Sequence, residues 1–394
     1  MDHVRNPFAP GAGTQPPELA GRDAIIADAE TALKRALLGR QSRSQILLGL
    51  RGVGKTVLLN KIEETAEALG HLTSFIEAPE GKRLATLIVP KAQQILQKLS
   101  LNAAAKAKAH AALRALRSFA SAFKLNFGDY GLSVEPEPGI ADSGNLEYDL
   151  SELFIRIGEA AASASKGWTL LIDEVQYLKV DDFAALIVAI HKVNQKSLPV
   201  LFFGAGLPQV AALSGDAKSY AERLFAYPNI GPLDETASND AIRRPILEEN
   251  EAIAPTALAE IFRHTKGYPY FLQEWGYQTW NIASASPISA SNVEAASSLA
   301  LARLDEGFFK VRFDRLTPKE RDYVVAMATL GTGPYKSSEV AEVLGVDVQS
   351  LGPRRANIIN KGMIYSPAHG DIAFTVPLFE DYLHRNWMAK PGSA

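Results

Sequence analysis

The sequence contains no cysteine among its 394 residues. Disulfide frameworks, thiolate metal sites and cysteine nucleophiles are therefore excluded, and the composition fits a reducing compartment. No uninterrupted apolar run reaches the roughly 18 residues that are needed to span a bilayer. Residues 1–17 are rich in Pro, Gly and Ala and lack the apolar segment of a signal peptide. We therefore expect a cytoplasmic protein.

An excess of positive charge is also missing. The chain has 41 Lys and Arg against 44 Asp and Glu, which gives a formal net charge of −3. This balance excludes a protein that coats nucleic acid with its whole surface, so any such contact must be a local patch. Hydrophobic residues make up 47% and charged residues 22%, as in ordinary globular proteins. The length predicts two or three domains.

Short apolar segments alternate with helical patterns over the first 230 residues. The sequence predicts strands at residues 45–50, 71–77, 168–172 and 199–203, and helices at 22–38, 56–69, 91–123, 146–163 and 183–195. This alternation indicates βαβ units around a parallel sheet, which is the α/β class. An insertion at about residues 101–145 interrupts the pattern, with a helix and a predicted hairpin within residues 125–144.

The strongest motif is Gly49–Thr56, which fits G-x-x-x-x-G-K-[ST] and lies between a predicted strand and a predicted helix. Glycines let the backbone N–H groups face phosphate oxygens, and the helix N-terminus adds its positive dipole end. Lys55 would contact the β- and γ-phosphates, and the Thr56 hydroxyl would bind Mg²⁺. The alternative is a glycine-rich turn that carries Lys-Thr by chance. The predicted nucleotide contacts are Gly49, Arg51, Gly52, Val53, Gly54, Lys55, Thr56 and Val57.

A second motif is the apolar run Trp168–Ile172, which is followed by Asp173 and Glu174. Ligands of parallel α/β sheets bind at the carboxyl ends of the strands, where these two acids fall. Asp173 would hold Mg²⁺, and Glu174 would polarise the attacking water. The alternative is a pair of solvated loop acids, which the preceding phosphate loop, Gly49–Thr56, makes less favoured. The Asp-Glu pair, in place of Asp followed by an apolar residue, favours ATP hydrolysis over nucleotide holding alone.

With these motifs the chain resembles P-loop ATPases of the AAA+/STAND type, similar to archaeal and bacterial origin-recognition-like ATPases. The matching segments are Leu19–Asp23, Gly49–Thr56, Leu170–Gln176, Leu198–Phe203 and Gly267–Gln273. The resemblance implies ATP or ADP and Mg²⁺ as cofactors and ATPase activity. It places a P-loop core at residues 1–232, a helical lid at 233–310 and a winged helix-turn-helix at 311–394.

The resemblance also implies roles for residues outside the two motifs. Candidate contacts on the adenine side are Ala20, Gly21 and Arg22, although this segment could instead only cap the first helix. Arg223 occupies the place of an arginine finger that reaches the γ-phosphate of a neighbouring subunit. The alternative is an ordinary surface arginine, or one that is paired with Glu222. Pro269 of the lid would lie near the nucleotide.

Two departures from the family pattern affect the expected rate of ATP hydrolysis. The strand that should end in a polar sensor residue ends in Gly204-Ala205-Gly206, although Asn194 or Gln195 just before it could serve instead. The lid offers Tyr270 and Gln273 where an arginine is usual. A slow switch between ATP and ADP states therefore fits better than fast hydrolysis coupled around a ring.

The C-terminal segment predicts helices from Thr317 to Leu330, Ser337 to Leu344 and Gln349 to Lys361, and then a two-strand wing around His369. This order resembles a winged helix-turn-helix, whose third helix enters the DNA major groove. The predicted DNA contacts are Gln349, Arg354, Arg355, Asn357, Lys361 and His369. Between Lys310 and Arg385 ten Lys and Arg face nine acids, so a protein-binding winged helix is the alternative.

Two functions of different classes follow. The first is an ATP-binding and slowly hydrolysing switch whose nucleotide state controls DNA or partner binding through the winged helix. The alternative is a regulatory scaffold of the toxin–antitoxin or phage-defence type, in which nucleotide is structural and the winged helix binds a protein. Both hypotheses allow self-association of the protein, and neither predicts a contact with a membrane.

Overall fold

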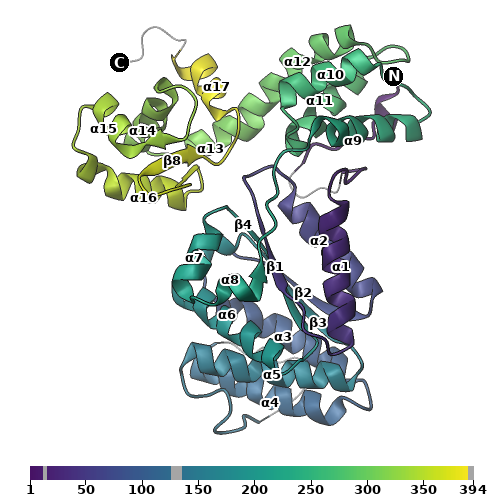
Figure 1. The fold of residues 1–394 in the computed structure, drawn as a ribbon, viewed down its shortest axis with the longest axis vertical. Coiled ribbons are helices and arrows are strands. Elements are labelled where there is room, and N and C mark those ends of the chain that lie inside the picture. The colour runs from purple at the N-terminus through teal and green to yellow at the C-terminus, as the bar shows by residue number, and fades with distance from the viewer. Residues whose placement is uncertain (12–15, 126–134, 389–394) are drawn as a thin grey trace. The chain divides into compact units, whose positions relative to one another are not determined.

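The computed structural model describes residues 1–11, 16–125 and 135–388, and its chain divides into two compact units (Figure 1). The sheet unit comprises Arg22–Gly49 and Lys55–Ile230. The helical unit comprises Met1–Gly21, Leu50–Gly54 and Gly231–Ala394. None of the described helices combines the length and the apolarity that a bilayer crossing needs.

A five-stranded sheet forms the centre of the sheet unit, and all its pairings are parallel. The strands lie in the order β2 (His71–Glu77), β3 (Gly167–Asp173), β4 (Val200–Gly206), β1 (Ser44–Leu48) and β5 (Phe225–Ala226). Every residue of β1, β3 and β4 is buried, as expected for parallel strands covered on both faces. The predicted parallel α/β core is confirmed. Because β4 lies between β1 and β3, its carboxyl end separates the ends of those two strands.

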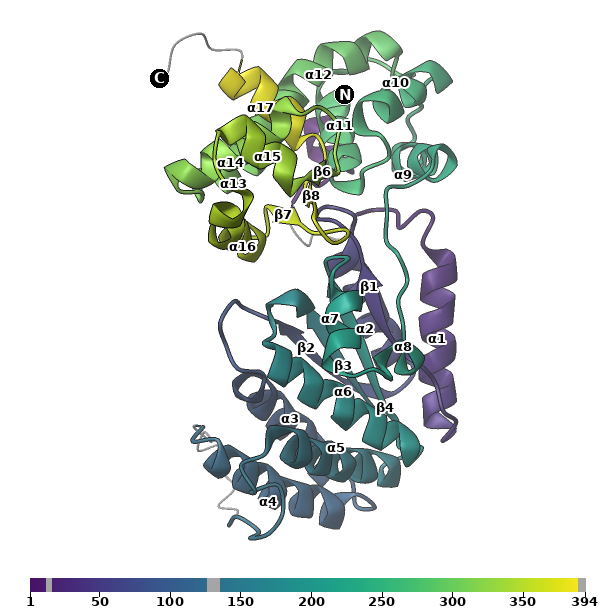
Figure 2. The same cartoon turned by 60° about the vertical axis from the view of Figure 1, so that its left-hand side comes forward.

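Helices cover both faces of this sheet (Figure 2). Helices α1 (Asp23–Leu37) and α2 (Lys55–Ala68) pack on one face, and α3 (Leu84–Ser100), α5 (Leu146–Ser163) and α6 (Val180–Gln195) pack on the other. Helix α4 (Lys106–Ala122) packs on α3 and α5, while α7 (Val210–Ala217) and α8 (Ala221–Leu224) follow β4. Phe154 of α5 contacts Trp168 of β3 edge-on at 4.8 Å between ring centroids.

The single helix predicted at residues 91–123 is wrong, because the structure has two helices there. Helix α3 begins already at Leu84, whose N–H donates to the buried Asp182 carboxylate at 2.8 Å. It ends before Asn102, whose side chain accepts from the N–H groups of Ala104 and Ala105 and so competes with helix continuation. The predicted hairpin falls mostly on residues 126–134, which lie outside the described residues.

Residues 235–304 of the helical unit are mostly helical, as predicted, while their role as a lid stays a prediction. They form a bundle of α9 (Glu235–Glu248), α10 (Pro255–Thr265), α11 (Pro269–Ile282) and α12 (Ala290–Leu304). Helix α12 continues through the π-helical turn η3 (Asp305–Lys310) into α13 (Val311–Asp314). The N-terminal arm, with the short turn η1 (His3–Arg5), packs on this bundle, and Phe8 lies against Gly276 of α11.

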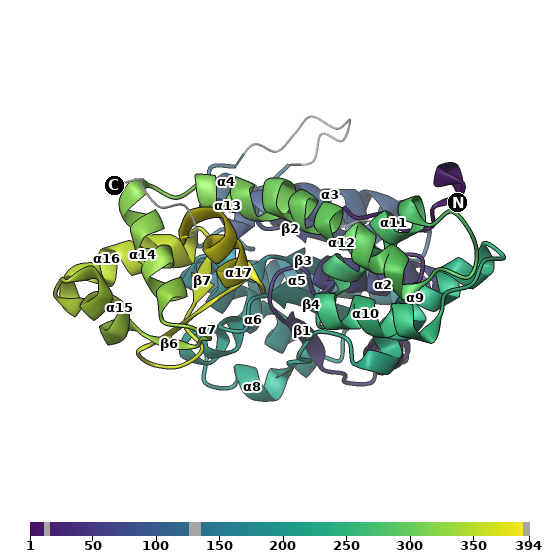
Figure 3. The ribbon, with the colours of Figure 1, turned by 90° about the horizontal axis from the view of Figure 1, so that it is seen from above.

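The C-terminal part contains α14 (Pro318–Thr329), β6 (Tyr335–Lys336), α15 (Ser337–Leu344), α16 (Gly352–Asn360), β7 (Ile364–Tyr365), β8 (Asp371–Phe374), α17 (Phe379–Leu383) and the π-helical turn η5 (His384–Met388). Figure 3 shows α14, α15 and α16 beside the short strands. The strands pair antiparallel in the order β6-β8-β7. Helix α16 starts three residues later than predicted, after the 3₁₀ turn η4 (Val348–Leu351), where the Asp347 side chain accepts from Gln349 N–H. The assignment as a winged helix stays a prediction.

The loop that enters α11 allows a test of packing in the helical unit. Gly267 has φ of +74°, and a Cβ atom there would lie 2.0 Å from the Leu233 carbonyl oxygen. Gly345 after α15 has φ of +64°, and a Cβ atom there would meet nothing within 4 Å. We expect Gly345→Ala to lower the free energy of unfolding by about 1 kcal/mol and Gly267→Ala by about 2–4 kcal/mol. Denaturant unfolding followed by tryptophan fluorescence measures both, and equal losses would contradict the predicted clash.

Candidate nucleotide-binding site

The loop Gly49–Thr56 joins the end of β1 to the start of α2. Gly52 and Gly54 have φ of +83° and +90°, a region that side-chain-bearing residues rarely adopt. A Cβ atom on Gly54 would meet no heavy atom within 4 Å, so the backbone and not crowding requires glycine there. The open space beside Gly54 and the first turn of the 14-residue helix α2 fit a phosphate group.

Lys55 and Thr56 begin helix α2 and have different partners. Lys55 is 7% exposed, and its Nζ donates to the Gly49 carbonyl at 2.9 Å. The Lys55 ammonium group is thus held beside the loop Gly49–Thr56, where it would contact a bound phosphate. Thr56 Oγ1 donates to Asp173 Oδ2 at 2.5 Å, which joins the loop to the end of β3. The two predicted magnesium ligands therefore lie in contact.

Asp173 is buried at the last position of β3. Burial raises the pKa of its carboxyl group, and the neighbouring Glu174 adds to this effect, while the hydrogen bond from Thr56 and the charge of Lys55 oppose it. A hydroxyl and a carboxylate are the hard oxygen ligands that Mg²⁺ prefers. Among the described residues no group of three or more His, Asp or Glu could hold a metal. Mg²⁺ is usually bound by one or two protein ligands together with waters and substrate phosphates.

Glu174 has an unusual backbone and a defined side-chain contact. Its φ of +55° and ψ of +43° are left-handed, a backbone conformation that costs a non-glycine residue about 1–3 kcal/mol. Its Oε2 accepts a hydrogen bond from Gln176 Nε2 in the turn η2 (Val175–Tyr177). Gln176 Oε1 in turn accepts from Leu207 N–H at 3.1 Å. Sequence reasoning assigned no role to Gln176, although it lies within the segment that matches the family.

The end of β4 carries no polar side chain, as the sequence predicts. Gly206 contributes its carbonyl, which accepts from Gly49 N–H at 3.1 Å. Asn194 and Gln195 cannot replace a sensor residue, because they end α6 beside the amino end of β4. The Asn194 carbonyl accepts from Gln41, which precedes β1 at the same edge of the sheet. The suggestion that either residue serves as the sensor is therefore wrong.

The candidate adenine-side residues fall in both units. Ala20 and Gly21 belong to the helical unit, where a Cβ atom on Gly21 would lie 2.8 Å from Ala237 Cβ of α9. Arg22 is the N-cap residue of α1 and makes no side-chain capping bond, and burial lowers the pKa of its guanidinium group. Pro269 is the first residue of α11. The contact of Ala20, Gly21 and Arg22 with adenine stays a prediction. The nearness of Pro269 to the nucleotide and the nucleotide contact of Val57, on the first turn of α2, also stay predictions.

Arg223 lies exposed on the four-residue helix α8. It is close enough to His191 of α6 for its charge to help lower the pKa of that imidazole, after burial and Lys192. Exposure is compatible with a contact to another subunit, and the role as an arginine finger stays a prediction.

Some of the predicted DNA contacts have exposed side chains, and others bond to residues within the protein. Gln349, Asn357 and His369 are exposed. Arg354 and Arg355 are only half-buried, and Arg355 donates to Ser337 Oγ at 3.0 Å. Lys361 pairs with the Glu320 carboxylate at 2.6 Å and donates to the Arg315 carbonyl. The ion pair lowers the pKa of Glu320 against the opposing effect of burial.

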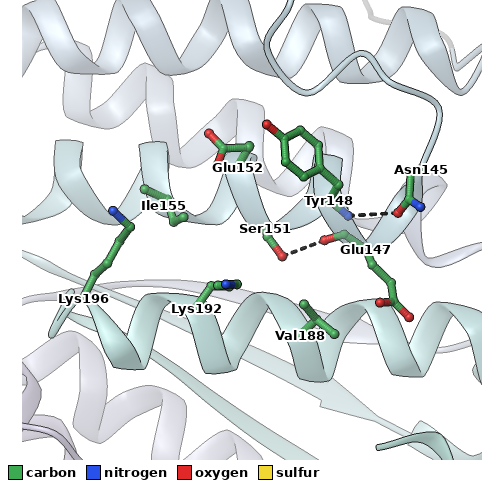
Figure 4. Close-up of a pocket in the computed structure, with 9 residues that line it drawn as sticks. All are labelled: Asn145, Glu147, Tyr148, Ser151, Glu152, Ile155, Val188, Lys192 and Lys196. Carbon is green, nitrogen blue, oxygen red and sulfur yellow. Dashed lines mark hydrogen bonds between the residues drawn. The ribbon is translucent and has the colours of Figure 1, made fainter.

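A groove of about 400 Å³ lies on the helical layer of the sheet unit, between α5 and α6 (Figure 4). Lys192 and Lys196 line it from α6, and Glu147 and Glu152 line it from α5. Glu147 is paired with Lys218 at 2.8 Å. Because no residue of the phosphate loop or of the end of β3 lines this groove, it is separate from the candidate nucleotide site.

Two family models match the chain. Residues 18–203 match one that is described as an AAA ATPase domain, and residues 306–383 match one that is described as a domain of unknown function. No curated protein matches the sequence.

Solved structures resemble the chain over nearly its whole length. The Walker-type ATPase PABY2304 of Pyrococcus abyssi is 17% identical, with a TM-score of 0.52, over 93% of this chain and 96% of that one. The ORC1 protein of Aeropyrum pernix, solved in complex with DNA, is 14% identical with a TM-score of 0.48, over 97% and 96%. A variant of RuvB from Thermotoga maritima is 15% identical with a TM-score of 0.47, over 95% and 97%. The Pyrococcus abyssi structure supports the predicted parallel-sheet P-loop core.

The position of Lys55 makes a direct prediction for nucleotide binding. Lys55→Ala removes a charge-assisted contact to phosphate worth about 1.5–3 kcal/mol. We expect the Kd for ATP with Mg²⁺, measured by calorimetry, to rise at least about tenfold. Lys61→Ala, on the exposed face of the same helix, is the matched control and should leave the Kd unchanged. An unchanged Kd for Lys55→Ala would exclude this loop as the phosphate site.

Proposed function

We propose that the protein binds ATP with Mg²⁺ and hydrolyses it slowly, because residues 18–203 match a family model that is described as an AAA ATPase domain. The observation that carries the proposal is the contact of Thr56 with Asp173 at 2.5 Å, beside a loop whose glycines expose backbone to a phosphate group. Bound between the phosphates and these two side chains, Mg²⁺ would supply positive charge to the transferring phosphoryl group.

Hydrolysis would then depend on Glu174. Its carboxylate lies one residue beyond the metal ligand Asp173, at the end of β3. It would accept a proton from water as the water oxygen attacks the γ-phosphorus and the bond from that phosphorus to the β–γ bridging oxygen breaks. Lys55 would contact the β- and γ-phosphates and hold them for this attack. The absence of a polar side chain at the end of β4 favours a low rate.

Contacts within the helical unit support a switch role. Tyr270 N–H at the start of α11 donates to the Gly52 carbonyl of the phosphate loop at 3.2 Å. The Tyr270 ring stacks on Phe308 of η3 at 4.6 Å between centroids. The adjacent Phe309 stacks on Tyr382 of α17 at 5.3 Å. A change in the phosphate loop on ATP binding would thus reach the C-terminal part through packed aromatic rings.

We further propose that the C-terminal part is a winged helix that binds DNA through α16. Helix α16 carries Arg354 and Arg355 and no acid, and exposed Gln349 and Asn357 lie near its start and on its surface. Such side chains contact phosphates and base edges when a helix enters the major groove. The engagement of Arg355 with Ser337 leaves Arg354 as the leading phosphate contact. Binding of a protein by the same surface is the alternative.

The role of Glu174 is tested by Glu174→Gln, which keeps the shape of the side chain but loses the charge that accepts the proton. We expect ATP to bind with a Kd within about twofold of wild type and hydrolysis to fall at least about a hundredfold. Phosphate release at saturating ATP measures the rate. Glu64→Gln, an exposed substitution of the same kind on α2, is the control. Wild-type turnover by Glu174→Gln would refute the proposed role.

DNA binding is tested by Arg354→Glu. We expect Arg354→Glu to abolish the shifted complex with duplex DNA in electrophoresis. For the neutral variant Arg354→Gln, the slope of log binding constant against log salt concentration should be shallower than for wild type by about one. Lys319→Glu, an exposed charge reversal on α14, should leave the shift unchanged. ATPase activity serves as the folding control for both. If Arg354→Glu binds DNA as wild type does, α16 faces something else and the protein-binding alternative gains support.

A further inference from the structure

Gln176 bridges two parts of the candidate site that sequence reasoning left unconnected. Its carboxamide donates to the Glu174 carboxylate through Nε2 and accepts from the Leu207 N–H through Oε1 at 3.1 Å. One side chain therefore ties the candidate catalytic carboxylate to the residue that follows β4. Both ends of the carboxamide are used, so its orientation is fixed by two hydrogen bonds.

The glycine at the end of β4 leaves space for this carboxamide. A Cβ atom on Gly206 would lie 2.8 Å from Gln176 Oε1, which is closer than real Cβ atoms approach. It would also lie 2.7 Å from Val210 Cγ2. The Gln176 amide thus occupies the place into which a side chain at position 206 would project. The Gln176 carboxamide can therefore take this position only because residue 206 is a glycine.

The same peptide unit also contacts the phosphate loop. The Gly206 carbonyl accepts from Gly49 N–H at 3.1 Å, and the Leu207 N–H donates to Gln176. The carbonyl of residue 206 and the N–H of residue 207 belong to one planar peptide group, which moves as a rigid body. Any shift of Gly49 that carries this carbonyl would turn the N–H that orients Gln176, and through Gln176 the Glu174 carboxylate.

We propose that Gln176 is a positioning residue for ATP hydrolysis, whose carboxamide occupies the space that Gly206 leaves at the end of β4. It holds the Glu174 carboxylate in one direction and couples it, through the peptide group of residues 206 and 207, to Gly49, the first residue of the phosphate loop. This inference rests on the proposed hydrolysis and extends it to the regulation of the same site. The left-handed backbone of Glu174 is consistent with a side chain held in one direction.

A double-mutant cycle tests the proposal. Gln176→Met keeps the length of the side chain and removes both hydrogen bonds. We expect it to lower kcat about tenfold to a hundredfold, because a carboxylate misplaced by about 1 Å loses this much rate, while the Kd for ATP stays within about twofold. In the Glu174→Gln background the same substitution should change the residual rate by less than about twofold, because Gln176 acts only through Glu174.

Controls separate this inference from the proposed function and from a structural effect. Gln195→Met, an exposed substitution at the end of α6, should leave kcat unchanged. Gln176→Glu keeps the acceptor for Leu207 N–H but loses the donor to Glu174, and should lower kcat as Gln176→Met does.

If Glu174→Gln stops hydrolysis but Gln176→Met retains the wild-type kcat, the inference is wrong and the proposed function stands. Equal losses from Gln176→Met in both backgrounds, or a loss of ATP affinity, would assign Gln176 a structural role. If Glu174→Gln leaves turnover unchanged, the proposed function itself fails.

Discussion

The position of β4 between β1 and β3 is the constraint on which the candidate site depends. Because β4 lies between the strand that leads into the phosphate loop and the strand that ends in Asp173, the residue at its carboxyl end lies beside both. A bulky residue there would fill the space, whereas Gly206 admits the Gln176 carboxamide. Thr56 and Asp173 meet at the same end of the sheet. The strand order therefore brings the phosphate loop, the acids after β3 and the Gln176 carboxamide to the same end of the sheet.

The sequence was sufficient to predict the parts of this arrangement that local chemistry determines. Gly52 and Gly54 adopt the positive φ that the motif requires, and the apolar run before Asp173 is a buried central strand. The predicted strand before Gly49 and the predicted helix after Thr56 are both present, which is the context that the motif requires. The contact of Thr56 with Asp173 was predicted as a shared metal site and is present as a direct hydrogen bond.

Tertiary partners account for what the sequence did not reveal. Asp182, about a hundred residues away, accepts from Leu84 and sets the start of α3, which no local pattern encodes. Lys361, a predicted DNA contact, pairs with the buried Glu320 of α14, a partner that its own segment does not reveal. Gln176 had no assigned role because its importance depends on Gly206 of another strand. Such pairings join residues that are distant in sequence, so periodicity and propensity carry no signal of them.

The fate of ATP bound to the wild-type protein tests the central claim most directly. In a single-turnover experiment, labelled ATP at a concentration below that of the protein is mixed with Mg²⁺, and the bound nucleotide is separated and identified over time. The account predicts that ATP binds and is converted slowly to ADP on the protein, and that removal of Mg²⁺ with a chelator stops the conversion. Nucleotide that fails to bind, or that remains ATP for many hours with Mg²⁺ present, would contradict it.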